Sequence, residues 1–97
     1  DEREYFQLCG FLLMARLLMK GEKLNERAEA EFLDQAYTVI EGGSMQVQKA
    51  ASVALRKFAH QSRESKRVVS KQLGLWMKSE NPTVHALAEE IKADLEY

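Results

Sequence analysis

The sequence predicts an all-α protein of about five antiparallel helices. Three observations support this fold class. Apolar residues recur at helical spacing along most of the chain, and residues that favour helix N-caps precede four of these segments. No stretch of about four to eight residues alternates as a half-buried strand would. The 97 residues suffice for one hydrophobic core, so we expect a single all-α domain over residues 1–97, or a fragment of a longer helical array.

The first predicted helix covers about residues 3–20 and contains the most apolar run of the chain, Leu8–Met19. Apolar side chains surround most of its circumference, which is typical of a helix buried between neighbours. The run is shorter than the roughly 20 residues that span a bilayer, and Arg16 interrupts it, so we expect a buried helix and no membrane association. Gly21 is the expected C-terminal stop.

The single cysteine, Cys9, lies within this apolar run. One cysteine excludes an internal disulfide framework and fits a reducing, intracellular compartment, either cytoplasmic or nuclear. No cation lies near it in the sequence to lower its pKa, so we expect a packed thiol without a catalytic role.

The next two helices form a predicted hairpin over about residues 25–61. Asn25 is the expected N-cap of the first helix, which ends at Gly42–Gly43 because glycine adopts the left-handed conformation at little cost. The second helix starts from Ser44. Its stripe of mostly small apolar side chains allows close helix packing and comprises Val47, Ala50, Ala51, Ala54, Leu55 and Phe58.

A second predicted hairpin covers about residues 63–97. Ser62 can cap its first helix, which runs to about Lys78. Asn81–Pro82 is the clearest boundary of the chain, since an N-cap residue is followed by proline at the first helical position. The apolar side of the first helix, which we expect to face the core, contains Val68, Val69, Leu73, Trp76 and Met77.

The two hairpins repeat each other at an offset of 37 residues. In the first helices, Phe32, Val39 and Ile40 align with Val69, Trp76 and Met77. In the second helices, Val47, Ala51, Ala54 and Phe58 align with Val84, Ala88, Ile91 and Leu95.

The pattern of the second helices resembles the HEAT-repeat family, in which this helix typically reads valine, two variable positions, two alanines, two variable positions, alanine and leucine. Val47, Ala50, Ala51, Ala54 and Leu55 match it well, and Val84, Leu87, Ala88 and Ile91 match it moderately. Gln48 and His85 stand where the family often has arginine, and neither intra-repeat turn contains aspartate. The resemblance covers about residues 25–97. It implies a helical superhelix that binds proteins along the ridge of its second helices, and the alternative is a compact five-helix bundle with an accidental repeat.

Basic residues are concentrated in the middle of the chain. Residues 46–78 contain eight basic residues and one acidic residue, whereas residues 1–45 and 79–97 each have a net charge of −4. These cations either lie on solvated outer faces or form a binding surface. Such a surface would bind an acidic protein segment or nucleic-acid phosphate. Nucleic acid is the less favoured partner, because the aromatics of the basic stretch, Phe58 and Trp76, lie on core stripes and leave none in that stretch for base stacking. The candidate partner-binding residues are Lys49, Arg56, Lys57, His60, Arg63, Arg67, Lys71 and Lys78.

No motif indicates a metal, a cofactor or a catalytic site. His60 and Glu64, like His85 and Glu89, are four residues apart, but two ligands do not make a zinc site, and Ser62 is expected to separate the first pair. No glycine-rich phosphate loop or nucleophile elbow is present. The sequence therefore predicts a non-catalytic protein-interaction or scaffold module. Nucleic-acid binding by the same basic face is the alternative, and a small catalytic bundle is the least favoured.

Overall fold

The computed structural model describes residues 2–96, and most of these residues belong to five α-helices. Within this part of the chain there is no β-strand, so the predicted all-α fold class is confirmed. None of the five helices is both long enough and apolar enough to cross a membrane. The helices are α1 (Glu2–Met19), α2 (Glu26–Gly42), α3 (Met45–Ala59), α4 (Arg63–Trp76) and α5 (Pro82–Leu95).

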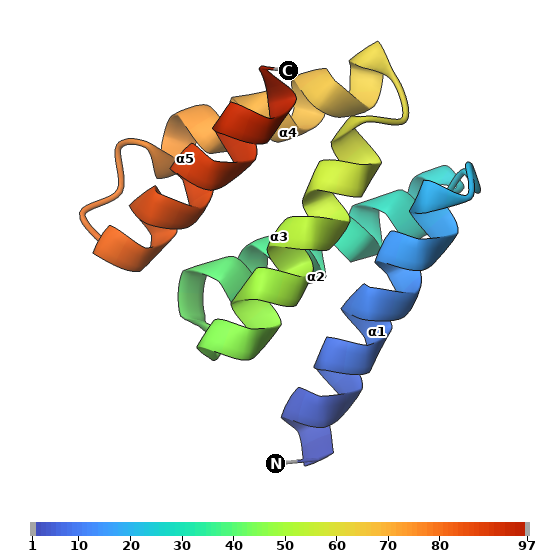
Figure 1. The fold of residues 1–97 in the computed structure, drawn as a ribbon, viewed down its shortest axis with the longest axis horizontal. Helices are drawn as coiled ribbons and strands as arrows, with labels where there is room; N and C mark the ends of the chain where they lie inside the picture. Colours follow the sequence, from blue (N-terminus) through green and yellow to red (C-terminus); the bar gives the residue numbers. More distant parts are fainter. Residues whose placement is uncertain (1, 97) are drawn as a thin grey trace.

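The helices form two layers (Figure 1). α3 lies between α1 and α5 in the nearer layer, and α2 and α4 lie behind them. The molecule measures 35 × 34 × 22 Å, so it is a slab roughly two helix diameters of about 10 Å thick. α3 contacts each of the other four helices and is therefore the centre of the fold.

The two predicted hairpins begin in equivalent ways. α4 begins at Arg63, 37 residues after Glu26 of α2, and α5 begins at Pro82, 37 residues after Met45 of α3. The N-cap residues follow the same offset, because Ser62 corresponds to Asn25 and Asn81 corresponds to Ser44. The offset found in the sequence is thus also an offset between helix starts.

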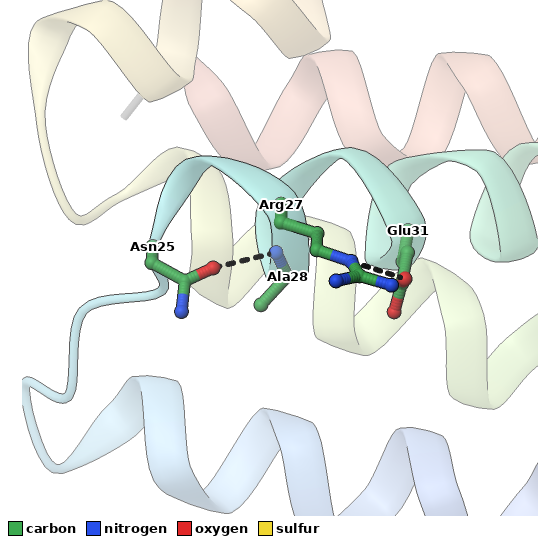
Figure 2. Close-up of polar contacts among 4 residues, drawn as sticks. All are labelled: Asn25, Arg27, Ala28 and Glu31. Atoms are coloured by element: carbon green, nitrogen blue, oxygen red, sulfur yellow. Dashed lines mark hydrogen bonds and ion pairs between the residues drawn. The ribbon is translucent and has the colours of Figure 1, made fainter.

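Each predicted N-cap satisfies a backbone N–H at the start of its helix, which would otherwise lack a partner. At the start of α2, the Asn25 Oδ1 atom accepts a hydrogen bond of 2.8 Å from the Ala28 N–H (Figure 2). From the same turn, Arg27 forms an ion pair of 3.5 Å with Glu31, which adds little stability because both side chains are largely exposed. The other caps are Ser44, Ser62 and Asn81.

Two glycine positions end helices for different reasons. Gly21 has φ of +88°, so it is the expected left-handed stop after α1. The same explanation for Gly42–Gly43 is wrong, because Gly43 is extended, with φ of −86° and ψ of 180°. Its N–H donates a hydrogen bond to the Val39 carbonyl, and a Cβ atom there would lie 2.8 Å from that oxygen. Gly43 is thus needed for close backbone approach and not for its φ angle.

The core is centred on α3. All six residues of its predicted apolar stripe are buried, and Gln48, Ser52 and Ala59 are buried as well. The Gln48 amide donates a hydrogen bond of 2.9 Å to the Ile40 carbonyl of α2, which allows a polar side chain in this position. Phe58 packs against Phe32 with ring centroids 5.7 Å apart, and Phe32 packs against Phe11 at 6.5 Å, so aromatic contacts join α3, α2 and α1.

The expectation that α1 is buried between neighbours is wrong. Only Phe11, Ala15 and Leu18 of this helix are buried. α1 lies at the edge of its layer, so α3 and the Phe32 side chain cover one face and leave the outward face open. Cys9 is exposed on that face, which also overturns the expectation of a packed thiol.

Candidate partner-binding surface

The eight candidate residues lie on two separate surfaces. The first is the α3 ridge, which we define as Lys49, Arg56, Lys57 and His60 in the nearer layer of Figure 1. The second is the α4 face, which we define as Arg63, Arg67, Lys71 and Lys78 on α4 and the turn that follows it. The two surfaces are contiguous in the sequence but belong to different layers of the fold.

The α4 face points away from the α3 ridge. Arg67, Lys71 and Lys78 are exposed, and they lie opposite the buried stripe of α4, as predicted. That stripe includes Trp76, whose ring makes an edge contact with the Tyr37 ring of α2 at a centroid distance of 5.2 Å. Since α4 packs against α3 and α5, its exposed cations lie on the side of α4 that these two helices leave uncovered. A partner that binds one side of the slab therefore contacts either the α3 ridge or the α4 face and not both.

The α3 ridge occupies the part of α3 that its neighbours leave accessible. Lys49 is exposed, whereas Arg56 and Lys57 are half-buried between the flanking helices. Half-buried basic side chains of this kind pack their aliphatic stems against apolar neighbours and keep their charged ends in water. Their charged groups are consequently less free to move than those of fully exposed lysines.

A cationic hollow of about 500 Å³ lies where the end of α3 meets the end of α1. None of its seven lining residues is acidic, and it combines basic and apolar side chains. Its lining residues are Leu18, Met19, Gly21, Lys23, Lys57, His60 and Gln61. Gln61 builds the site, because its side-chain amide donates hydrogen bonds to the carbonyls of Leu18 at 3.3 Å and Glu22 at 2.5 Å. These bonds satisfy carbonyls at the end of α1 and fix it against α3.

His60 joins the cationic hollow to α5. Its Nε2 atom lies 2.8 Å from the Oδ2 atom of Asp94, and both side chains are roughly 40% exposed. His60 ends α3, whereas Glu64 lies on α4 beyond the Ser62 cap. The cap therefore separates the two residues, as predicted. His85 forms a surface pair with Glu89 at 3.4 Å. In the described part of the chain, no three histidine, cysteine or acidic residues form a group that could hold a metal ion.

The other end of the α3 ridge has a mixed charge. Lys49 lines a hollow of about 870 Å³ between α3 and α5, and Glu89 and Glu90 line the same hollow. The two carboxylates offset the single ammonium group there. An anionic partner is therefore attracted more strongly to the cationic hollow at the C-terminal end of α3 than to the N-terminal end.

Sequence reasoning missed five of the seven lining residues of the hollow, and the polar ones among them are Lys23 and Gln61. Lys23 lies in the turn after α1, and Gln61 lies in the turn after α3. Neither is notable by its local pattern, and they meet because α1 packs alongside α3. The sequence signals this part of the site only by a basic residue in one turn and an amide residue in another.

The chain matches no protein-family model, no curated protein and no solved structure. Its function must therefore be inferred from the geometry and charge of the α3 ridge.

Proposed function

We propose that this domain is a non-catalytic protein-interaction module whose α3 ridge binds an acidic segment of a partner protein. The observation that carries this proposal is the cationic hollow, where Lys23 and Lys57 flank apolar side chains and no lining residue is acidic. The 37-residue offset between the helix starts and the two-layer arrangement support HEAT-like stacking, in which second helices such as α3 form a binding ridge. A helical scaffold of this kind would keep the hollow in place while a flexible partner segment orders on it.

The chemistry of the hollow selects a particular kind of segment. A carboxylate that enters it can lie between the ammonium groups of Lys23 and Lys57, while Leu18 and Met19 offer contact to an apolar neighbour. We therefore expect an acidic residue next to a leucine or an aromatic to bind better than acidic residues alone. Because the site is open to water, its affinity should fall as salt screens the charges.

Nucleic acid is the second candidate, since its phosphates share the negative charge of a carboxylate. Base stacking would require exposed aromatics near the cations. Among residues 2–96, the exposed aromatic side chains are Tyr5 and Phe6, which lie at the start of α1, whereas the cationic hollow lies at its end. This separation of about 20 Å along the helix favours a protein partner over a nucleic acid.

The proposal is tested by fluorescence anisotropy with a labelled peptide of alternating glutamate and leucine at low salt. A peptide with glutamine in place of glutamate is the ligand control. Lys57→Glu should weaken binding by at least about tenfold, because it places a carboxylate in the hollow. Lys71→Glu makes the same charge change on the opposite α4 face and should change the affinity less than about twofold.

Three results would oppose the proposal. Equal losses from Lys57→Glu and Lys71→Glu would mean that net charge and not the hollow attracts the peptide. If the glutamine peptide binds as tightly as the glutamate peptide, the cations do not contribute to binding. Tighter binding of a single-stranded oligonucleotide, with a loss on Lys71→Glu, would favour the nucleic-acid alternative and place its site on the α4 face.

A further inference from the structure

The outward face of α1 is the main exposed apolar surface of the molecule. Of the eight large apolar side chains that are exposed in residues 2–96, six lie on this helix. We call them the α1 face: Tyr5, Phe6, Leu12, Leu13, Leu17 and Met19. Their exposed fractions run from 37% to 70%. With about 150–250 Å² for each full side chain, they expose on the order of 700 Å².

That area exceeds what a monomer normally leaves in contact with water. The largest apolar patch on a typical monomer is about 300–600 Å², whereas each partner of a stable complex contributes about 800 Å². Met45 and Leu75, the two remaining large apolar residues that are exposed, lie singly on other helices and need no such explanation. The α1 face is therefore large enough to form one half of an interface.

The centre line of this face has a regular pattern. Taking 100° per residue, the positions that lie opposite the buried stripe of Phe11, Ala15 and Leu18 are spaced alternately by four and three residues. All of these positions are exposed. This spacing is that of the seam through which two helices pack in a coiled coil. The seam residues are Glu2, Phe6, Cys9, Leu13, Arg16 and Lys20.

The seam is complementary to itself when it is reversed. In an antiparallel pair centred near residue 11, Glu2 of one copy lies opposite Lys20 of the other. In the same register Phe6 lies opposite Arg16, and Cys9 lies opposite Leu13. The three layers then match a carboxylate with an ammonium group, an aromatic ring with a guanidinium group, and two apolar side chains with each other.

A parallel pair would have the opposite charge pattern. Each of the charged seam residues Glu2, Arg16 and Lys20 would then face its own copy, and like charges would meet in three layers. The antiparallel register also satisfies the two-fold symmetry of most homodimers, since each contact occurs twice. The charge order along α1 thus favours an antiparallel pair of copies over a parallel pair.

We propose that α1 pairs antiparallel with α1 of a second copy of the chain, about a two-fold axis near the middle of the helix. Tyr5, Leu12 and Met19 lie along one side of the seam and Leu17 along the other, and they widen the contact. Together the two copies bury on the order of 1,400 Å², which is the size of a standard specific interface. The α1 face shares Met19 with the cationic hollow, but the pairing does not depend on what the hollow binds.

Sedimentation velocity over a range of protein concentrations tests the pairing. We expect the wild-type chain to shift from 11.1 kDa to twice that mass as its concentration rises. Leu13→Glu should raise the dissociation constant by at least about 100-fold, because a carboxylate enters the seam twice. Leu75→Glu makes the same change at a leucine of similar exposure on α4 and should leave the constant unchanged. Circular dichroism of each variant checks that the fold is retained.

Charge reversal tests the antiparallel register. Lys20→Glu places a carboxylate opposite Glu2 and should weaken the dimer by about 3- to 10-fold, and Glu2→Lys should do the same. The double variant Glu2→Lys/Lys20→Glu restores opposite charges and should recover wild-type affinity. In a parallel pair the single changes would leave like charges opposite each other, so they would have no such effect.

The proposal is overturned if the folded wild-type chain remains at 11.1 kDa up to about millimolar concentration, a range that covers interfaces of very low affinity. It is equally overturned if dimers form and Leu13→Glu leaves them intact, since another surface would then be responsible. The antiparallel register would be refuted if Leu13→Glu weakens the dimer while both single charge reversals leave the dissociation constant unchanged.

Discussion

α1 and α3 are neighbours in the same layer, but the helix with the bulkier apolar side chains is the more exposed of the two. α1 contains the most apolar run of the chain and leaves six large apolar side chains exposed. α3 is rich in alanine and buries nine of its fifteen residues. Small side chains let four helices approach α3 closely. The backbone of α1, by contrast, lies close to the backbone of α3 and of no other helix. Burial thus depends on position in the fold more than on apolar content.

Phenylalanine truncation should give the largest contrast between the two helices. Phe58 of α3 is 1% exposed and Phe6 of α1 is 70% exposed. Phe58→Ala removes the contact with Phe32 and leaves a cavity, so it should lower the free energy of unfolding by about 3–5 kcal/mol. Phe6→Ala should change it by less than about 0.5 kcal/mol in dilute protein. Urea denaturation measures both values, and similar losses would contradict the assigned burial.

Enlargement of an alanine should give a smaller contrast. Ala51 is fully buried at the centre of α3, so Ala51→Leu should overpack the core and lower the free energy of unfolding by about 1–3 kcal/mol. Ala30 is exposed on α2, and Ala30→Leu should change it by less than about 0.5 kcal/mol. The same denaturation experiment compares them. A neutral Ala51→Leu would mean that the packing around α3 is loose.

A third effect is confined to high pH, where a tyrosine ionises. Burial first, and the charge of Glu29 second, raise the pKa of Tyr37 from 10.0 to about 12. Between these values the unfolded chain loses the tyrosine proton and the folded chain keeps it. The stability that protonated Tyr37 contributes should therefore be fully present below about pH 10 and should decline as the pH rises toward 12. Tyr37→Phe should remove this part of the decline in denaturation curves, and an unchanged decline would refute the assignment.

Features that depend on neighbouring residues in the sequence could be predicted well. Asn25, Ser44, Ser62 and Asn81 each cap a helix as expected, because capping needs only the side chain and a backbone N–H two or three residues later. The stripe of α3 was also predictable, since helical periodicity determines which residues share a face. The edge position of α1 was not predictable, because an apolar helix gives the same pattern whether or not a neighbour covers it.

The candidate site shows the same division. The basic composition of residues 46–78 is evident in the sequence, but its separation into the α3 ridge and the α4 face depends on how the layers stack. The contact between His60 and Asp94 joins residues 34 positions apart, and Gln61 bonds to Leu18 across 43 positions. No local pattern encodes such contacts. The cationic hollow is consequently a property of the fold and not of any one segment.

The reactivity of Cys9 tests the central comparison most directly. Its thiol is exposed on the seam of α1, so in dilute protein it should react with a thiol reagent within about tenfold of the rate in urea. If α1 pairs as proposed, this rate should fall as the protein concentration rises, and Leu13→Glu should abolish that dependence. A rate in dilute protein about 1,000-fold or more below that of the unfolded chain would show that α1 is enclosed and would contradict the account.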